Sequence, residues 1–168
     1  MTDKLIDLSC RDFVTAMGSS AAVPGGGGAA GLGGAMGMAL INMVIRLTIG
    51  KKKYAQYEDE LKALLEKGEA LQEEILQRVD ADADAFEPLS KAYGLPKNTD
   101  EEKAKKAEIL SQAAIGACNV PLEVASLLVQ GLGVAKRVAE IGSLLVISDV
   151  ACGAEMMAAA VKCAEQNV

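Results

Sequence analysis

The feature that most constrains the fold is an uncharged stretch of 23 residues, from Val23 to Ile45, which contains eight glycines. As a helix, this stretch would be long enough to cross a membrane. Asn42 within it is polar, however, and no second segment of this kind is flanked by typical loops. We therefore predict a soluble central helix without membrane insertion, surrounded by other helices that pack against its small residues.

A long amphipathic segment follows this helix. Over residues 51–93, apolar side chains recur at helical spacing among Glu, Lys and Gln. These apolar positions are Tyr57, Leu61, Leu64, Leu71, Ile75, Val79 and Phe86. Pro88 is expected to kink or end the helix, because proline lacks the N–H group that a helix interior needs.

Two capping boxes predict further helix starts. Ser9 with Asp12 predicts a short helix from Cys10, and Thr99 with Glu102 predicts a helix that begins near residue 100. The first is expected to end at about residue 17 and the second at about residue 119, before the next proline.

The C-terminal third of the chain completes the pattern. Pro121 is expected to interrupt the helix that starts near residue 100, and another helix follows to about Glu140. A turn at Gly142–Ser143 then precedes a last apolar helix. Strand-like alternation is absent, so the chain is predicted to be all-α. We expect an up-and-down bundle of five to six helices with a long apolar central helix, forming a single domain over residues 1–168.

Composition excludes several classes of function. The chain has no histidine, which removes Ser-His and Cys-His dyads and the commonest ligand of zinc and iron, so no metal site is expected. The net charge of −6 argues against nucleic-acid binding, which needs a basic face.

The four cysteines form no C-x-x-C pair, and nothing at the N-terminus resembles a signal peptide. We therefore expect reduced, small core residues in a cytoplasmic protein. The cysteines are Cys10, Cys118, Cys152 and Cys163.

Pro24, Gly25, Gly26 and Gly27 open the central helix and suggest an anion site. Bare backbone N–H groups can converge at such a turn, and a helix that begins there directs its positive end at an anion. Lys51, Lys52 and Lys53 follow the helix and add full positive charge. The alternatives are a tight turn with close helix contacts for the glycines, and a solvated helix start for the lysines.

Asp82 is the candidate acid–base group. At 100° per residue from Ile75, Val79 lies near about 40° and Asp82 near about −20°, within the apolar stripe. Asp80 and Asp84 fall at about 140° and 180°, on the polar side. Desolvation in the stripe would raise the pKa of the Asp82 carboxyl toward the range useful for proton transfer. The alternative is a buried ion pair with a lysine or Arg46.

Two further polar positions lie near the C-terminus. Ser148 and Asp149 stand in an apolar stretch, where they would either cap the last helix or belong to a site. Asn167 lies at the end of the chain, where sequence patterns say little.

Taken together, these residues resemble the formimidoyltetrahydrofolate cyclodeaminase / methenyltetrahydrofolate cyclohydrolase family, from about residue 9 to 168. Each block is weak alone, but the ordered set is specific. The blocks are Pro24–Gly27, Ala35–Thr48, Gly50–Tyr54, Asp82–Phe86, Ala92–Thr99, Val120–Leu122, Ser148–Asp149 and Asn167–Val168.

The resemblance implies an all-helical homodimer that acts on a tetrahydrofolate derivative and holds no permanent cofactor. The implied reaction is cyclodeamination of 5-formiminotetrahydrofolate to 5,10-methenyltetrahydrofolate and ammonia. Hydrolysis of 5,10-methenyltetrahydrofolate to 10-formyltetrahydrofolate is the close alternative, and a non-catalytic helical assembly module is the second. Asp82 aligns with the family's aspartate, and the resemblance implies that Pro24–Gly27, Lys51–Lys53, Ser148, Asp149 and Asn167 bind substrate.

The sequence departs from the family pattern at three positions. Gly28 stands where Ser is frequent, Ser143 where Asn is frequent, and Lys106 where Arg is usual. A lysine cannot reproduce the bidentate grip of arginine on a carboxylate. Relatives are also expected to continue past the position of Val168 into a long final helix.

Overall fold

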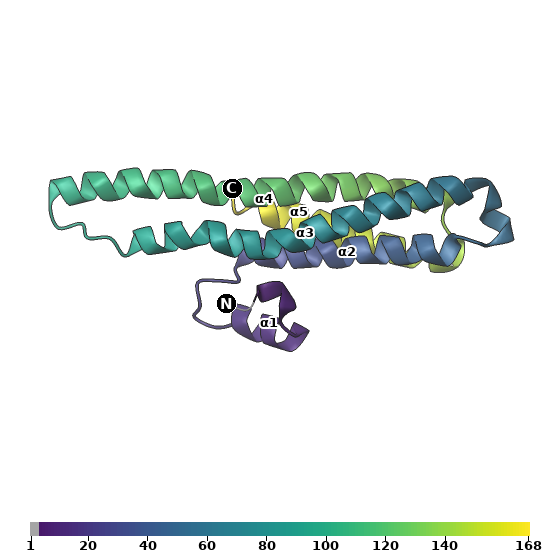
Figure 1. Ribbon diagram of the computed structural model, residues 1–168, viewed down its shortest axis with the longest axis horizontal. Helices are drawn as coiled ribbons and strands as arrows, with labels where there is room; N and C mark the ends of the chain where they lie inside the picture. The colour runs from purple at the N-terminus through teal and green to yellow at the C-terminus, as the bar shows by residue number, and fades with distance from the viewer. Residues whose placement is uncertain (1–3) are drawn as a thin grey trace.

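The computed structural model describes residues 4–168 and contains five α-helices (Figure 1). Their bounds are Cys10–Met17 (α1), Gly26–Thr48 (α2), Glu58–Tyr93 (α3), Asp100–Ile141 (α4) and Ile147–Glu165 (α5). Short 3₁₀ helices span Leu5–Asp7, Lys52–Tyr57 and Leu144–Val146, and residues 4–168 contain no strand. The all-α prediction, with five to six helices, is confirmed.

Helices α2 to α5 form an antiparallel four-helix bundle (Figure 1). Helix α2 packs against α3, α4 and α5, and the core includes Met38, Ile41, Ile75, Leu128 and Met157, each with no exposed surface. The apolar stripe of α3 lies in this core, so its periodicity identified the buried face correctly.

Glycines bring α2 and α5 into backbone contact. A Cβ atom built on Gly37 would lie 2.7 Å from the carbonyl oxygen of Gly153, and one on Gly153 would lie 2.6 Å from that of Gly37. Part of the glycine content of the central helix therefore serves close helix packing.

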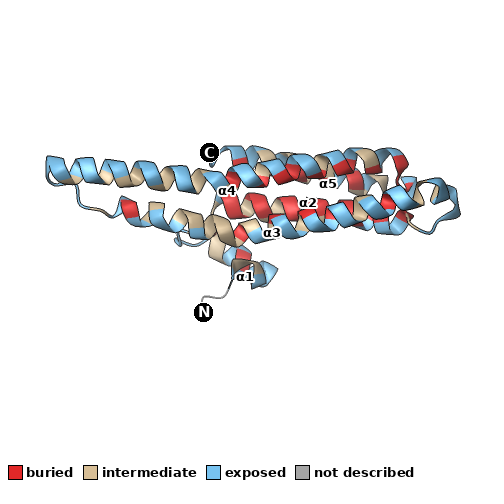
Figure 2. Ribbon diagram, turned by 45° about the horizontal axis from the view of Figure 1, so that its top comes forward, coloured by how far each residue is buried: buried red, intermediate tan, exposed pale blue. Residues whose placement is uncertain are grey.

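Helices α3 and α4 extend beyond the other two as a hairpin, and buried residues concentrate where all four helices overlap (Figures 1 and 2). Lys106 ties the loop at the end of this hairpin, because its Nζ donates to the carbonyl oxygens of Tyr93 and Leu95, each at 2.7 Å. Both predicted capping boxes begin a helix as expected, with Ser9 Oγ accepting from Asp12 N and Thr99 Oγ1 from Glu102 N.

Two of the four prolines, Pro88 and Pro121, lie inside continuous helices. Pro88 is within α3, which runs on to Tyr93, and Pro121 is within α4, so the predicted break of α4 is wrong. Proline removes one helical hydrogen bond and adds a local steric conflict. Val124 and Leu128, which follow Pro121 in the same helix, are buried in the core.

Helix α2 is not surrounded on all sides, contrary to prediction. Met36 is 49% exposed and Leu47 is 44% exposed, and Met43 lies between them on the same open face. Met36 and Met43, with Ala39, Leu40 and Met156, line a shallow apolar depression between α2 and α5.

Three segments of the described chain are long and apolar enough to cross a membrane: Gly26–Thr48, a part of Asp100–Ile141, and Leu144–Glu165. The expectation of a single such segment is therefore wrong, because α4 and α5 carry many small apolar residues on their outer faces. The prediction of no membrane insertion stays a prediction.

The cysteines were expected in the core, and none is there. Cys10, Cys152 and Cys163 are exposed, Cys118 is half-buried, and all four are free thiols. The core consists instead mainly of Leu, Ile, Val, Met and Ala side chains.

Candidate functional site

A cavity of about 270 Å³ lies at the N-terminal end of α2, at the base of the α3–α4 hairpin. The segment before α2, the first turn of α2, one face each of α3 and α4, and the end of the chain enclose it. The lining residues are Ala22, Val23, Gly25, Gly26, Gly27, Asp82, Phe86, Leu89, Ala114, Ala117, Cys118, Pro121 and Asn167.

Asp82 lies directly over the start of α2. A Cβ atom built on Gly27 would lie 2.1 Å from Asp82 Oδ1, which is far inside van der Waals contact. Only glycine at position 27, which has no Cβ atom, allows the Asp82 carboxylate to occupy this space. The glycine block therefore makes room for Asp82, and it also packs α2 against α3, where Gly31 faces Val79.

Burial raises the pKa of the Asp82 carboxyl above its ordinary value of 3.8, and a hydrogen bond from the backbone N–H of Gly28 partly offsets that rise. The anion at the N-terminus of α2 is thus the protein's own carboxylate. None of the ion pairs among residues 4–168 includes Asp82. Arg46, its candidate partner, pairs with Glu69 instead. Asp82 is therefore a half-buried carboxyl without a cationic partner among the described residues.

The two neighbouring aspartates face elsewhere, as the helical angles predicted. Asp80 accepts a hydrogen bond of 2.6 Å from the backbone N–H of Leu5. It thereby fixes the N-terminal 3₁₀ helix to α3. Asp84 is exposed.

Asn167 joins the same end of the bundle. A Cβ atom on Gly26 would lie 3.2 Å from Asn167 Nδ2, and that nitrogen donates to the carbonyl oxygen of Cys163 at 2.8 Å. Pro24 is buried and packs against Gly28. The structure thus brings the predicted residues Pro24–Gly27, Asp82 and Asn167 together.

The predicted lysines lie at the other end of the bundle. Lys51, Lys52 and Lys53 are exposed and follow the C-terminal end of α2, whose 23 residues span roughly 33 Å. Within one chain they are therefore remote from Asp82.

A second polar cluster surrounds Lys51. Its Nζ donates to Ser143 Oγ at 3.3 Å, and Ser143 N donates to the buried Thr48 Oγ1 at 2.9 Å. Leu144 N donates to Tyr54 Oη at 3.2 Å, and this bond lowers the pKa of the Tyr54 phenol. Sequence reasoning did not single out Thr48 and Tyr54, although both belong to the quoted sequence blocks.

Ser148 and Asp149 do not cap α5, so that alternative is wrong. The helix begins at Ile147, and Val146 is at the capping position with no side-chain hydrogen bond. Asp149 lies in the first turn, where a carboxylate is favoured by the helix dipole. Both residues lie at the Lys51 end of the bundle, away from Asp82.

Phe86 and Cys118 are cavity residues that sequence reasoning did not assign to a site. Phe86 could have been found, because it follows Asp82 by one helical turn on the same face. Cys118 could not, because its contribution depends on how α4 docks; its Sγ donates to the carbonyl oxygen of Val168 at 3.2 Å.

The arrangement offers one carboxyl of raised pKa in a largely apolar cavity, which suits proton transfer to and from a bound molecule. Among residues 4–168 no group of three or more Asp, Glu or Cys side chains is placed to hold a metal ion.

Comparison with known proteins identifies the family of this chain. The sequence model of the family described as formiminotransferase-cyclodeaminase matches residues 9–168. A methenyltetrahydrofolate cyclohydrolase of Methylorubrum extorquens is 46% identical over 93% of this chain and 75% of its own length. Mouse formimidoyltransferase-cyclodeaminase is 34% identical over 98% of this chain, which spans 30% of that protein.

A solved structure has the same fold. The formiminotetrahydrofolate cyclodeaminase of Thermotoga maritima superposes with a TM-score of 0.84 at 28% identity, covering 96% of this chain and 77% of that protein.

Proposed function

This chain belongs to the formiminotransferase-cyclodeaminase family, and we propose that it transfers protons at the one-carbon unit of a tetrahydrofolate derivative, with Asp82 as the acid–base group. The observation that carries the proposal is the half-buried, unpaired Asp82 carboxyl at the cavity over Gly27. The cavity of about 270 Å³ is smaller than typical pockets for whole drug-sized ligands, so it would hold the reacting heterocycle and leave the tail outside.

We propose hydrolysis of 5,10-methenyltetrahydrofolate as the first candidate reaction, because the relative of higher identity bears that name. In this reaction the Asp82 carboxylate takes a proton from water as the water oxygen bonds to the methenyl carbon. The protonated carboxyl then donates that proton to N5 as the carbon–N5 bond breaks. The adduct oxygen loses its remaining proton to solvent as it becomes the formyl oxygen, which leaves 10-formyltetrahydrofolate.

Cyclodeamination, preferred from the sequence, stays the second candidate, since a solved relative of the same fold bears that name. Here N10 bonds to the carbon of the protonated formimino group, and Asp82 moves a proton from N10 to the amino nitrogen of the adduct, which departs as ammonia and leaves the methenyl cation. Both reactions need one group of raised pKa that can accept and return a proton.

Assays of both substrates on one preparation test the proposal. We expect loss of the methenyl compound, or release of ammonia from the formimino compound, by wild-type protein. Asp82→Asn should abolish turnover and preserve helicity and folate binding. Asp84→Asn, which changes an exposed carboxylate on the same helix, should retain turnover. Full activity of Asp82→Asn would refute the role. A folded protein that binds no reduced folate would favour a non-catalytic assembly module.

We further propose that the protein is a cytoplasmic homodimer that pairs through the open face of α2. Met36 and Met43 mark that face, and a twofold axis between them would set Gly27 of one copy opposite Lys52 of the other. Such pairing would bring the second copy's lysines to the substrate tail beside Asp82. It would also cover the exposed methionines.

A mixed-dimer experiment tests this arrangement. Asp82→Asn and a Lys51–Lys53→Ala variant should each be inactive alone and should regain activity when coexpressed, because one of the two shared sites is then intact. A purely monomeric protein in light scattering, or no recovery on mixing, contradicts the shared site. Recovery without detergent in the soluble fraction would support the absence of membrane insertion.

A further inference from the structure

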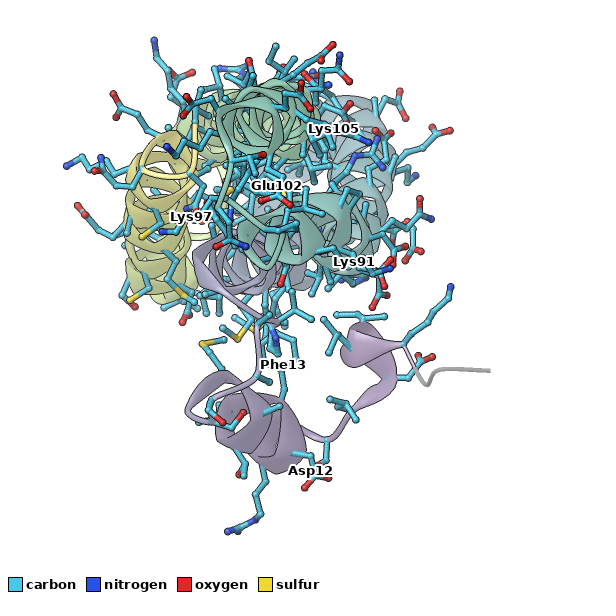
Figure 3. The ribbon with its side chains drawn as sticks, turned by 90° about the vertical axis from the view of Figure 1, so that its left-hand side faces the viewer. Asp12, Phe13, Lys91, Lys97, Glu102 and Lys105 are labelled. Atoms are coloured by element: carbon cyan, nitrogen blue, oxygen red, sulfur yellow. The ribbon has the colours of Figure 1, made fainter. Side chains whose placement is uncertain are left out.

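Phe86 lies in the cavity beside Asp82. The two residues are one helical turn apart on α3, and both line the cavity. Phe86 is half-buried, so part of its ring is accessible from the cavity side. The chain has one other phenylalanine, Phe13 of α1, which is buried and points toward the bundle from outside it (Figure 3).

The cavity lining combines the Phe86 ring with one carboxyl group and otherwise mostly small or apolar residues. The described lining residues include one aromatic ring, one carboxyl and no lysine or arginine. The remaining walls are mostly glycine, alanine and aliphatic side chains. A flat cation would meet a complementary surface here, with an aromatic face and a negative charge one turn apart, whereas an anion would meet no basic side chain.

The proposed substrates supply such a cation. The methenyl bridge between N5 and N10 is a planar amidinium, and a protonated formimino group has the same character. A cation over an aromatic face is attracted by the ring quadrupole, and the attraction grows when water is excluded.

We infer that Phe86 is a further substrate-binding residue, whose ring holds the positively charged amidinium of the one-carbon unit by a cation–π contact within reach of Asp82. This inference rests on the proposed function. It predicts that the protein distinguishes a charged one-carbon unit from a neutral one through this ring.

The test compares a cationic ligand with a neutral one. Dissociation constants are measured for 5,10-methenyltetrahydrofolate and for 5-formyltetrahydrofolate, whose formyl group is uncharged, in an Asp82→Asn background that prevents turnover. Adding Phe86→Leu should weaken binding of the methenyl compound by about 3- to 30-fold and leave the formyl compound within about 2-fold. Phe86→Tyr keeps an aromatic face and should restore the preference.

Phe13→Leu is the matched control, because it removes the other phenylalanine ring at a position outside the cavity, and it should change neither constant. Equal weakening of both ligands, or no weakening, would overturn the inference. Should Phe86→Leu fail to fold, Phe86→Met keeps a long apolar side chain without a ring and permits the same comparison. Wild-type protein that binds neither compound would defeat the proposed function itself, which is a different outcome.

Discussion

Asp82 occupies the space that any side chain at Gly27 would need. The built Cβ position of residue 27 lies 2.1 Å from Oδ1 and 2.5 Å from Cγ of Asp82. The acidic group and the glycine turn, which are 55 residues apart in the chain, therefore form one structural unit. The start of α2 is shaped around this carboxylate, and the Gly28 N–H directed at it tunes its pKa.

Gly27→Ala is expected to displace the Asp82 carboxylate and lower kcat by at least about 100-fold, the usual loss when an acid–base group is misplaced. The added methyl group cannot share the site with Oδ1, and the short aspartate side chain must rotate away. Turnover and circular dichroism measured together check this.

The control for Gly27→Ala is Gly133→Ala, an exposed position within α4 where an added Cβ meets no heavy atom within 4 Å. It should keep wild-type turnover. A fully active Gly27→Ala variant would mean that the Asp82 position is not required.

Asp82→Asn is expected to stabilise the protein near pH 7. Burial raises the native pKa of Asp82 above 3.8, so the stability associated with its neutral form is fully present below 3.8 and is lost as pH rises through the native pKa. Asparagine stays neutral throughout. The midpoint of urea unfolding for the variant should therefore exceed that of wild type by an amount that grows from pH 4 to pH 7.

Asp84→Asn serves as the comparison in these measurements, because Asp84 is exposed on the same helix, and its effect should show no such growth. A wild-type protein that is more stable than Asp82→Asn at pH 7 would contradict the sign of the shift.

The sequence predicts the Asp82 end of the site because its signals are local. Helical angles over α3 separate Asp82 from Asp80 and Asp84. In the structure Asp82 lies against α2, Asp80 accepts a hydrogen bond from Leu5, and Asp84 is exposed to solvent. The glycine turn is equally local. Helical periodicity and capping boxes likewise predicted the helices, apart from the wrong break at Pro121, because these patterns reflect interactions within a few residues.

The rest depends on how distant segments pack, which a single sequence does not display. A single site containing Lys51, Asp149 and Asp82 would require these motif residues to converge within one chain. The length of α2 prevents this, because it separates the two ends of the bundle. The sequence predicts a helix break at Pro121 because the missing N–H group of proline is a local property. The helix nevertheless continues past Pro121, and the packing of the residues beyond it cannot be deduced from one sequence. The cavity-lining residues of α4, such as Cys118, could not be predicted for the same reason.

The N-terminal segment is expected to loosen in Asp80→Ala. The Asp80 carboxylate accepts the Leu5 N–H at 2.6 Å, and this bond joins the segment to α3. Alanine removes the acceptor, while Asp80→Asn keeps an oxygen at the same place. Limited proteolysis should cut residues 4–25 faster in Asp80→Ala than in wild type, with Asp80→Asn intermediate. Equal cleavage rates in all three proteins would show that the bond does not hold the segment.

Gly37→Ala is expected to destabilise the bundle by about 1–3 kcal/mol or more, because the new methyl group meets backbone that cannot move aside. The obstacle is the carbonyl oxygen of Gly153, 2.7 Å from the built Cβ, so α2 and α5 must separate. Gly153→Ala should behave alike, since its Cβ would lie 2.6 Å from the Gly37 oxygen. Gly133→Ala, free of contacts, should instead gain about 0.5–1 kcal/mol from reduced chain entropy. Urea unfolding of the three variants measures these differences, and a Gly37→Ala protein as stable as Gly133→Ala would show that the two helices do not pack backbone to backbone.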